Sequence, residues 1–281
     1  MSEPQQANRP RHLFNVPQSE KPAVIIQAMS DMFTTLFPDR IRAIYLIGSQ
    51  TDQSAASMSD IDGGIIFKDA FSDETEQSLA ESMLAYCRRL SPIRLDFMVL
   101  AEDHPKLYTT PDIRLKQGSR LIYGEDIRDK LPTPTLDVYK VDMQDWATNF
   151  LTNLHELETL PITFTYPQPD DEFYGYTIKR AHYWYPAEVT AGTKELVATI
   201  CWCATALLAM EHDVMVSTRA ECIAMSQQHL GPKRGAFVAE AYELCKREWD
   251  YQVPTGEGER WKLREICDEA LEFFNRTRTV L

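Results

Sequence analysis

The sequence lacks any apolar run long enough to cross a membrane as a helix. Its most apolar stretch, from Leu196 to Met210, is interrupted by threonine and cysteine. The first residues are polar and lack the apolar segment of a signal peptide. These absences argue against a membrane span and against export. We therefore expect a cytoplasmic protein in which residues 1–20 form a disordered leader.

Cysteine pairing motifs are also missing. The chain has 6 cysteines, and none of them shows the Cys-x-x-Cys spacing typical of zinc sites and redox pairs. Most of them fall within stretches that have the pattern of amphipathic helices. Without an export signal, we expect buried, reduced thiols rather than disulfides or a zinc site.

Basic charge is scarce. The chain carries 29 lysines and arginines against 42 acidic residues, and its formal net charge is −13. A protein that binds the phosphate backbone of a long nucleic acid needs a basic footprint, and no run of lysine and arginine supplies one. The charge therefore argues against long nucleic acids as partners and favours cationic or neutral small molecules.

Two well-known catalytic motifs are absent as well. The glycine-containing stretch GPKRG, residues 231–235, lacks the spacing of a phosphate-binding P-loop, and we expect it to form a turn between helices. Ser49 follows a glycine but does not lie in a Gly-x-Ser-x-Gly elbow, which argues against a serine nucleophile.

The first part of the chain alternates between helical and strand patterns. Apolar residues at helical spacing predict helices over 21–37 and 73–90. Short runs rich in β-branched and aromatic residues predict three strands, Ile41–Ile47, Asp60–Phe67 and Arg94–Leu100. This order predicts an α/β (α+β) domain with a mixed sheet over residues 21–134, ending at a proline-containing linker.

Beyond the linker the pattern is helical, and we expect an all-α domain over residues 135–281. Amphipathic stretches predict helices over 143–160, 194–211, 237–249 and 261–276. The aromatic and acidic segment 165–190 between the first two helices shows no regular period.

Paired carboxylates lie in the stretch LIGSQTDQSAASMSDIDGGIIF, residues 46–67. Asp60 and Asp62 are two residues apart on an expected strand, so both side chains point to the same face of the sheet. Two carboxylates held this close repel each other unless a cation neutralises them. Mg²⁺ binds one or two carboxylates together with substrate phosphates, so the pair predicts a magnesium site.

A third carboxylate, Asp96, stands in the middle of the strand that contains Leu95 and Phe97. A charge at such a position is costly to bury without a partner. If this strand lies beside the strand of Asp60 and Asp62, the three acids form a single site for phosphoryl chemistry. Asp96 would then complete the metal site or act as a base.

Gly48 and Ser49 follow the first expected strand directly. Glycine at this position lets the backbone approach a phosphate closely, and the serine N–H and hydroxyl can donate to phosphate oxygens. If the turn opens a helix, the positive end of that helix would add to the attraction. Ser59, next to the paired acids, is a weaker candidate for the same role.

The combined pattern resembles the signature of the nucleotidyltransferases of the DNA polymerase β superfamily. That signature has Gly-Ser, a spacer that here is ten residues long, Asp-x-Asp in a strand, and an acid on a later strand. The matching residues are Gly48, Ser49, Asp60, Asp62 and Asp96. The segment QGSRLIYGEDI, residues 117–127, resembles the strand-end sequence that closes many such domains.

The C-terminal part is similar to the helical domain of bacterial aminoglycoside adenylyltransferases. KELVATICWC (194–203), followed by VMVSTRAEC (214–222), resembles a helix leading to a Ser-Lys-type turn. In that family the basic residue of the turn contacts the phosphate of ATP, and here Arg219 is the candidate. The sequence departs from the family at this turn, which has Thr218-Arg219, and at the Gly63-Gly64 pair, where relatives have bulky apolar residues.

The resemblance implies Mg²⁺-dependent transfer of a nucleoside monophosphate, AMP from ATP, to a hydroxyl of a small molecule such as an aminoglycoside. Asp60, Asp62 and Asp96 would bind the metal, and Gly48 and Ser49 would hold the phosphates. Two alternatives stay open. One is adenylylation of a protein or RNA partner. The other is a non-catalytic nucleotide-binding module, in which one carboxylate is usually lost, whereas all three are present here.

Other candidates favour structural roles. His182 could act as a base, although an isolated histidine is more often packed or exposed. The aromatic run 183–185 could stack on a base, and the acidic run 170–172 could bind substrate amines. Helix packing and a solvated acidic loop are the more common explanations for such runs.

Overall fold

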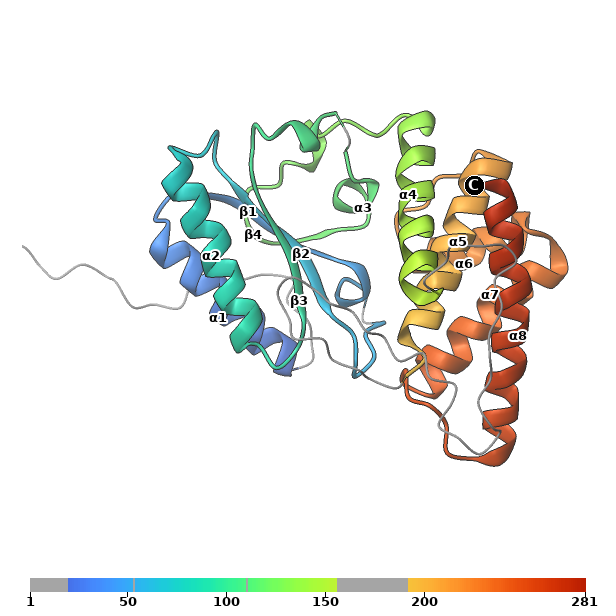
Figure 1. The fold of residues 1–281 in the computed structure, drawn as a ribbon. Coiled ribbons are helices and arrows are strands. Elements are labelled where there is room, and N and C mark those ends of the chain that lie inside the picture. The colour runs from blue at the N-terminus through green and yellow to red at the C-terminus, as the bar shows by residue number, and fades with distance from the viewer. Residues whose placement is uncertain (1–19, 53, 110, 156–191) are drawn as a thin grey trace, which may run out of the picture. The chain divides into compact units, whose positions relative to one another are not determined.

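The computed structural model describes residues 20–52, 54–109, 111–155 and 192–281 (Figure 1). The expected leader and the segment 165–190, with His182 and the aromatic and acidic runs, lie outside the described residues. Contacts divide the chain into two compact units. The N-terminal unit ends at Pro132, and the C-terminal unit comprises Thr133–Leu281 together with Ala55–Met58.

A mixed sheet forms the centre of the N-terminal unit. Its strands, in the part of the chain that the structure describes, are β1 (Ile41–Ile47), β2 (Ile61–Phe67), β3 (Leu95–Ala101) and β4 (Arg120–Gly124). Their order is β3-β2-β1-β4, with β2 parallel to β3 and β1 antiparallel to both of its neighbours. The three strands expected from the sequence are confirmed to within one residue at each end. The fourth lies inside the segment 117–127.

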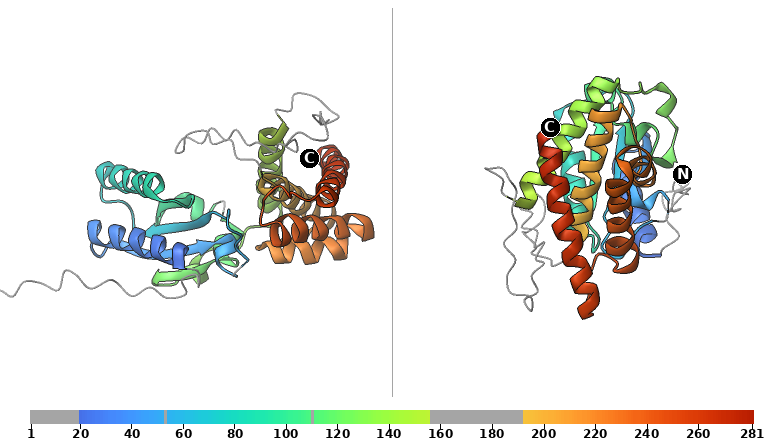
Figure 2. Two further views of the ribbon diagram at one scale, coloured as in Figure 1. Left: turned by 90° about the horizontal axis from the view of Figure 1, so that it is seen from below. Right: turned by 90° about the vertical axis from the view of Figure 1, so that its right-hand side faces the viewer.

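Two helices, α1 (Glu20–Leu36) and α2 (Glu74–Leu90), pack on one face of this sheet (Figures 1 and 2). Strand alternation turns every second side chain of β2 and β3 toward them. The buried cluster on this side includes Phe33, Leu84, Ile65 and Phe97. The opposite face carries a smaller apolar cluster and leaves part of β3 exposed.

Short elements cover the opposite face, among the described residues of the N-terminal unit. These are the 3-10 turns Pro105–Leu107 and Arg128–Lys130 and the short helix α3 (Ile113–Lys116). Because no long helix lies on this side in the described part of the unit, polar side chains of β2 and β3 can be accommodated here.

A buried tyrosine ties β1 to the loop after β4. The hydroxyl of Tyr45 donates to Asp126 at 3.1 Å and accepts from the backbone N–H of Ile127 at 2.8 Å. Burial raises the pKa of this phenol above its ordinary value of 10.0. Arg128 bonds both oxygens of Asp126, and its side-chain hydrogen bond holds the pKa of that carboxyl down to about 2. The network fixes the edge at which β4 joins the sheet.

The beginning of α2 is fixed to the chain just before β1. Asp73 caps the helix by accepting from the backbone N–H of Glu76 at 2.8 Å. Glu76 in turn accepts from Arg40 at 2.7 Å and from the backbone N–H of Ser72 at 2.6 Å. The hydrogen bond from Arg40 is the main reason why the pKa of Glu76 falls to about 2. These bonds hold α2 against the sheet.

The Gly63-Gly64 pair has two different structural roles. A methyl group on Gly63 would overlap the backbone oxygen of Tyr45 and the ring of Phe97, on the face covered by α1 and α2. A methyl group on Gly64 would meet Met98 at 3.5 Å, an ordinary contact, on the opposite face. Only the first glycine is therefore required by packing.

We expect Gly63→Ala to lower the free energy of unfolding by about 1–3 kcal/mol, the usual cost of overpacking a core. Gly64→Ala is the matched control and should change it by less than about 1 kcal/mol. Urea unfolding followed by circular dichroism measures both. Equal destabilisation by the two variants would contradict this assignment.

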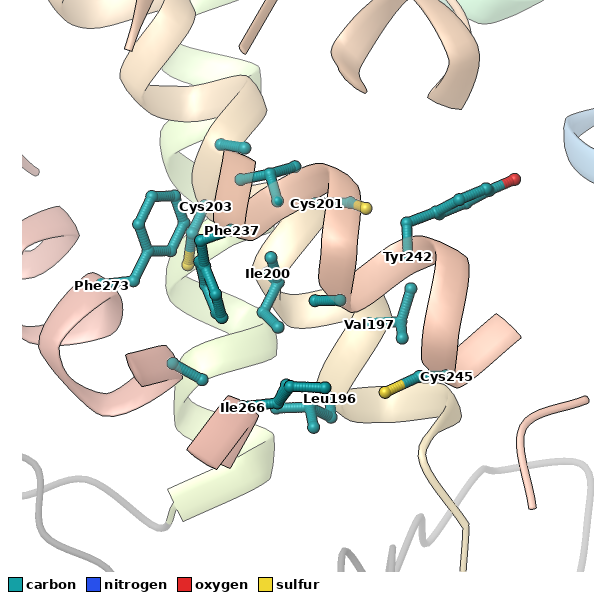
Figure 3. Packing of buried hydrophobic residues seen from close by; sticks show 14 of the residues in the cluster. Leu196, Val197, Ile200, Cys201, Cys203, Phe237, Tyr242, Cys245, Ile266 and Phe273 are labelled. Carbon is teal, nitrogen blue, oxygen red and sulfur yellow. The ribbon is translucent and has the colours of Figure 1, made fainter. Parts of the chain in front are cut away.

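Helices form the C-terminal unit. They are α4 (Leu136–His155), α5 (Lys194–His212), α6 (Arg219–His229), α7 (Gly231–Tyr242), a π-helical turn (Glu243–Glu248) and α8 (Glu257–Val280). Side chains of α5, α7 and α8 meet in its core, as Figure 3 shows for Ile200, Phe237 and Phe273. The helical nature of this part is confirmed, and α5 matches the expected range 194–211 to within one residue.

The boundaries of two helices differ from the predictions. GPKRG does not form a turn between helices but is the beginning of α7, with Pro232 in its first turn. Proline is tolerated there because the first N–H groups of a helix have no intrahelical partner. The helix expected over 237–249 instead changes at Glu243 into a π-helical turn. Local periodicity does not distinguish an α-helix from such a bulge.

All 6 cysteines are free and buried, as the sequence predicted. Burial is the main cause that raises the pKa of Cys222 to about 12, so this thiol stays protonated at neutral pH. The expectation that no apolar run reaches the length of a membrane span is wrong for α5, which among the described helices is long and apolar enough by length and composition. However, 78% of its apolar window is buried within the protein. That burial is typical of a core helix.

Candidate functional site

Asp62 and Asp96 lie directly beside each other on neighbouring strands. Parallel pairing of β2 with β3 puts Asp62 in register with Asp96. Neighbouring strands are about 4.8 Å apart, and side chains in register point to the same face. This face is the one opposite α1 and α2, because Ile61 and Leu95, one position earlier, are buried in the helix-covered cluster. Asp62 is half-buried and Asp96 is exposed.

Asp60 lies just outside the strand. The sequence predicted a strand from Asp60, whereas β2 begins at Ile61, whose N–H donates to the backbone oxygen of Arg94 at 2.9 Å. Asp60 is therefore the last residue of the preceding loop. It is half-buried and lies two positions before Asp62.

Gln50 connects the two halves of the site, a role that the sequence did not predict; its place directly after Gly48 and Ser49 is the one available signal. Its side chain is buried, and its Nε2 donates to the backbone oxygen of Asp60 at 3.4 Å. The turn after β1 and the residue before β2 are thereby held together.

Gly48 lies against Asp62. Its φ is +73°, in the left-handed region, and a Cβ on it would be 2.9 Å from Oδ2 of Asp62. The left-handed backbone favours glycine, and a Cβ here would displace the carboxylate of Asp62. The residue before it, Ile47, is the register partner of Asp62 in β1. The Gly-Ser turn and the acidic pair, separate in the sequence, therefore form one contiguous surface.

The turn at Gly48 does not open a long helix. It is a three-residue 3-10 turn, Gly48–Gln50, closed by the N–H and hydroxyl of Thr51 on the oxygen of Gly48 at 3.0 and 2.8 Å. The helix dipole considered from the sequence is therefore not available here. Ser49 is half-buried, whereas Ser59 is 6% exposed. Access for a phosphate is better at Ser49.

Arg219 belongs to the C-terminal unit, where it is the first residue of α6. Thr218 caps this helix by accepting from the N–H of Glu221 at 3.2 Å. The guanidinium of Arg219 lies 4.6 Å from the centre of the Trp202 ring, and Trp202 stacks on Trp146 at 5.0 Å. When a guanidinium stacks on an indole, its N–H donors lie in the guanidinium plane and stay available to bind an anion.

The donors of the acidic site suit a hard cation. Among the described residues, no three or more histidine, cysteine, aspartate or glutamate side chains are already arranged to hold a metal ion. Magnesium does not need such a cage, because it binds one or two carboxylates and takes its other ligands from phosphates and water. The acids of β2, its preceding loop and β3 provide carboxylates of this kind next to the space kept open by Gly48.

The fold is shared with a solved adenyltransferase structure. That structure is the spectinomycin adenyltransferase AAD(9) from Enterococcus faecialis with ATP and spectinomycin. The similarity covers 90% of this chain and 98% of that chain, with a TM-score of 0.51 and 12% sequence identity. This protein has the nucleotidyltransferase fold. A mixed-sheet domain followed by a helical domain, expected from the resemblance, is thus confirmed.

The sequence itself matches neither a protein-family model nor a curated protein. The nucleotidyltransferase fold is therefore known from the structure and not from a sequence match.

Proposed function

We propose that this protein is a cytoplasmic, magnesium-dependent adenylyltransferase that transfers AMP from ATP to a hydroxyl group of a small molecule. The observation that carries the proposal is the register of Asp62 with Asp96 beside the left-handed Gly48. Its nucleotidyltransferase fold, shared with a protein solved with ATP and spectinomycin, supports the same reaction class.

Each residue of the site has a task in this reaction. The backbone at Gly48 and the N–H and hydroxyl of Ser49 bind the β- and γ-phosphates, with Ser59 as a secondary donor. Asp60 and Asp62 would hold Mg²⁺, with Asp96 as a further ligand if it does not act as the base. When bound there, the ion would neutralise charge that develops on the triphosphate. Arg219 is proposed to contact a phosphate of ATP.

The transfer forms one bond and breaks one bond. The oxygen of the acceptor hydroxyl attacks the α-phosphorus of ATP, and the bond from that phosphorus to the bridging oxygen of pyrophosphate breaks. If Asp96 is the base, it accepts the proton that the hydroxyl loses; if it is a metal ligand, it helps to hold the ion that would acidify the hydroxyl. Its exposed position on β3 leaves it accessible to an acceptor.

The proposed acceptor is an aminoglycoside-type molecule. Such molecules are cationic, and a protein with a net charge of −13 attracts cations and repels long nucleic acids. The resemblance of the C-terminal part to aminoglycoside adenylyltransferases supports the same class.

The test is to incubate the protein with Mg²⁺, each of the four NTPs labelled at the α-phosphate, and a panel of aminoglycosides that includes spectinomycin. We expect label from ATP on an acceptor, release of pyrophosphate, and loss of both with EDTA. Label on a protein or RNA added from a cell extract would identify a macromolecular acceptor instead. Metal-dependent binding of ATP without transfer to any acceptor would identify a non-catalytic module.

A further inference from the structure

The loop between Gly48 and Asp60 is shared between the two units. Its middle residues, Ala55–Met58, form part of the C-terminal unit, whereas Ser59 and Asp60 belong to the N-terminal unit. Consecutive Cα atoms are about 3.8 Å apart, so whatever fixes Met58 also restricts where the chain enters Ser59 and Asp60.

Polar contacts within the C-terminal unit hold this segment. The backbone N–H of Ser57 donates to Oδ1 of Asp250 at 2.7 Å. Nζ of Lys194 donates to the backbone oxygen of Met58 at 2.8 Å, and Nε2 of Gln252 donates to its sulfur at 3.0 Å. Met58 also packs against the buried core of the unit. Two successive loop residues are thereby bound through a main-chain donor, a main-chain acceptor and a side chain.

Asp250 lies in a turn that is itself tightly bonded. It follows the π-helical turn, and both Asp250 and Tyr251 have left-handed backbones, with φ values of 49° and 64°. The N–H of Tyr251 donates to the oxygen of Cys245, and the oxygen of Tyr251 accepts from the N–H of Thr193, both at 2.8 Å. Left-handed non-glycine residues persist only where surrounding bonds enforce them. This turn therefore presents the Asp250 carboxylate in a fixed place.

We propose that Asp250 is a positioning residue for the nucleotide site: by holding Ser57 it keeps Ser59 and Asp60 at the entrance of β2. The expected effect on AMP transfer rests on the proposed function. The expected effect on the loop rests on the hydrogen bond between Ser57 and Asp250. Asp250 does not touch substrate in this proposal. It acts through the chain between Ser57 and Asp60.

Two substitutions distinguish the effect of the Asp250 acceptor oxygen from the effect of the left-handed turn. Asp250→Gly removes the acceptor but keeps the left-handed backbone, and Asp250→Asn keeps both an acceptor oxygen and a side chain that tolerates this backbone. In full-length Asp250→Gly we expect amide exchange to accelerate by about tenfold or more at Ser57. Exchange at Ile61, the first residue of β2, should also accelerate. AMP transfer should lose about tenfold in kcat/KM, while Asp250→Asn stays near the wild type in all three measurements.

Two results would overturn the proposal. One is faster exchange at Ser57 in Asp250→Gly with unchanged exchange at Ile61 and unchanged kinetics. The other is an equal loss in both variants, which would assign the effect to the turn and not to the acceptor oxygen. If the wild type transfers no nucleotide, the proposed function fails by itself, and the exchange of Ile61 still decides whether Asp250 positions the chain.

Discussion

Asp62→Asn is expected to lower kcat for AMP transfer by about a thousandfold, which corresponds to about 4 kcal/mol of transition-state stabilisation. Asp62 is in register with Asp96 and lies next to Gly48, where the phosphates are proposed to bind. Asparagine keeps the shape of the side chain but removes the charge that a magnesium ion needs. Asp60→Asn should have an effect of the same kind. Steady-state kinetics with labelled ATP, together with titration of Mg²⁺, measures the loss.

The stability of the Asp62→Asn variant should move in the other direction. Two like charges in register on neighbouring strands repel each other. Replacing one of the two carboxylates with a neutral amide removes this repulsion, so the thermal midpoint should stay unchanged or rise. This result would show that lost activity does not come from unfolding.

Asp69→Asn is the matched control for Asp62→Asn. Asp69 is exposed just after the same strand and has a left-handed backbone that asparagine adopts readily. We expect it to retain wild-type transfer. Full activity in Asp62→Asn would contradict the assignment of the acidic pair to catalysis.

Asp96→Asn is expected to lower turnover by about two to four orders of magnitude, the usual range for losing acid–base assistance. Asp96 is exposed on β3, on the face opposite the helices, and is in register with Asp62. If it is the base, the affinity for the metal–ATP complex should be nearly unchanged, because the ligands that hold the nucleotide remain. If it is mainly a metal ligand, that affinity should fall with turnover. Equilibrium binding of ATP at several Mg²⁺ concentrations separates the two roles.

Asp103→Asn provides the control for Asp96→Asn, because Asp103 is exposed shortly after the end of the same strand. It should leave both turnover and affinity unchanged. Wild-type turnover and affinity in Asp96→Asn itself would refute the three-carboxylate site and favour the non-catalytic alternative.

Much of the N-terminal unit could be predicted because its signals are local. The run 41–47 is rich in isoleucine and the run 94–100 in bulky apolar residues, and both are strands within one residue of the expected ends. The place of Asp62 within its strand sets the face of the sheet to which its side chain points. The error at Asp60 is not local in origin, because a strand begins where its hydrogen bonds to a neighbouring strand begin, and here that depends on Arg94, which is distant in the sequence.

The C-terminal unit was predictable only in outline. Amphipathic periodicity located α5 to within one residue, but it did not show that α7 begins at Gly231 or that it ends in a π-helical turn. A helix can include a proline in its first turn and a bulge near its end without a change in the apolar pattern that identifies it.

The sequence by itself determined which residues are proposed to carry the chemistry: Gly48 and Ser49 after one strand, two acids two residues apart and a third acid within a later strand. Only the tertiary structure decided that Asp96 is in register with Asp62, because α2 separates their strands and parallel pairing depends on how that helix packs. It also decided that Ser57 is held by Asp250, 193 residues away. Local sequence patterns predict the face to which a side chain points, whereas the packing of the whole chain determines which residues it contacts.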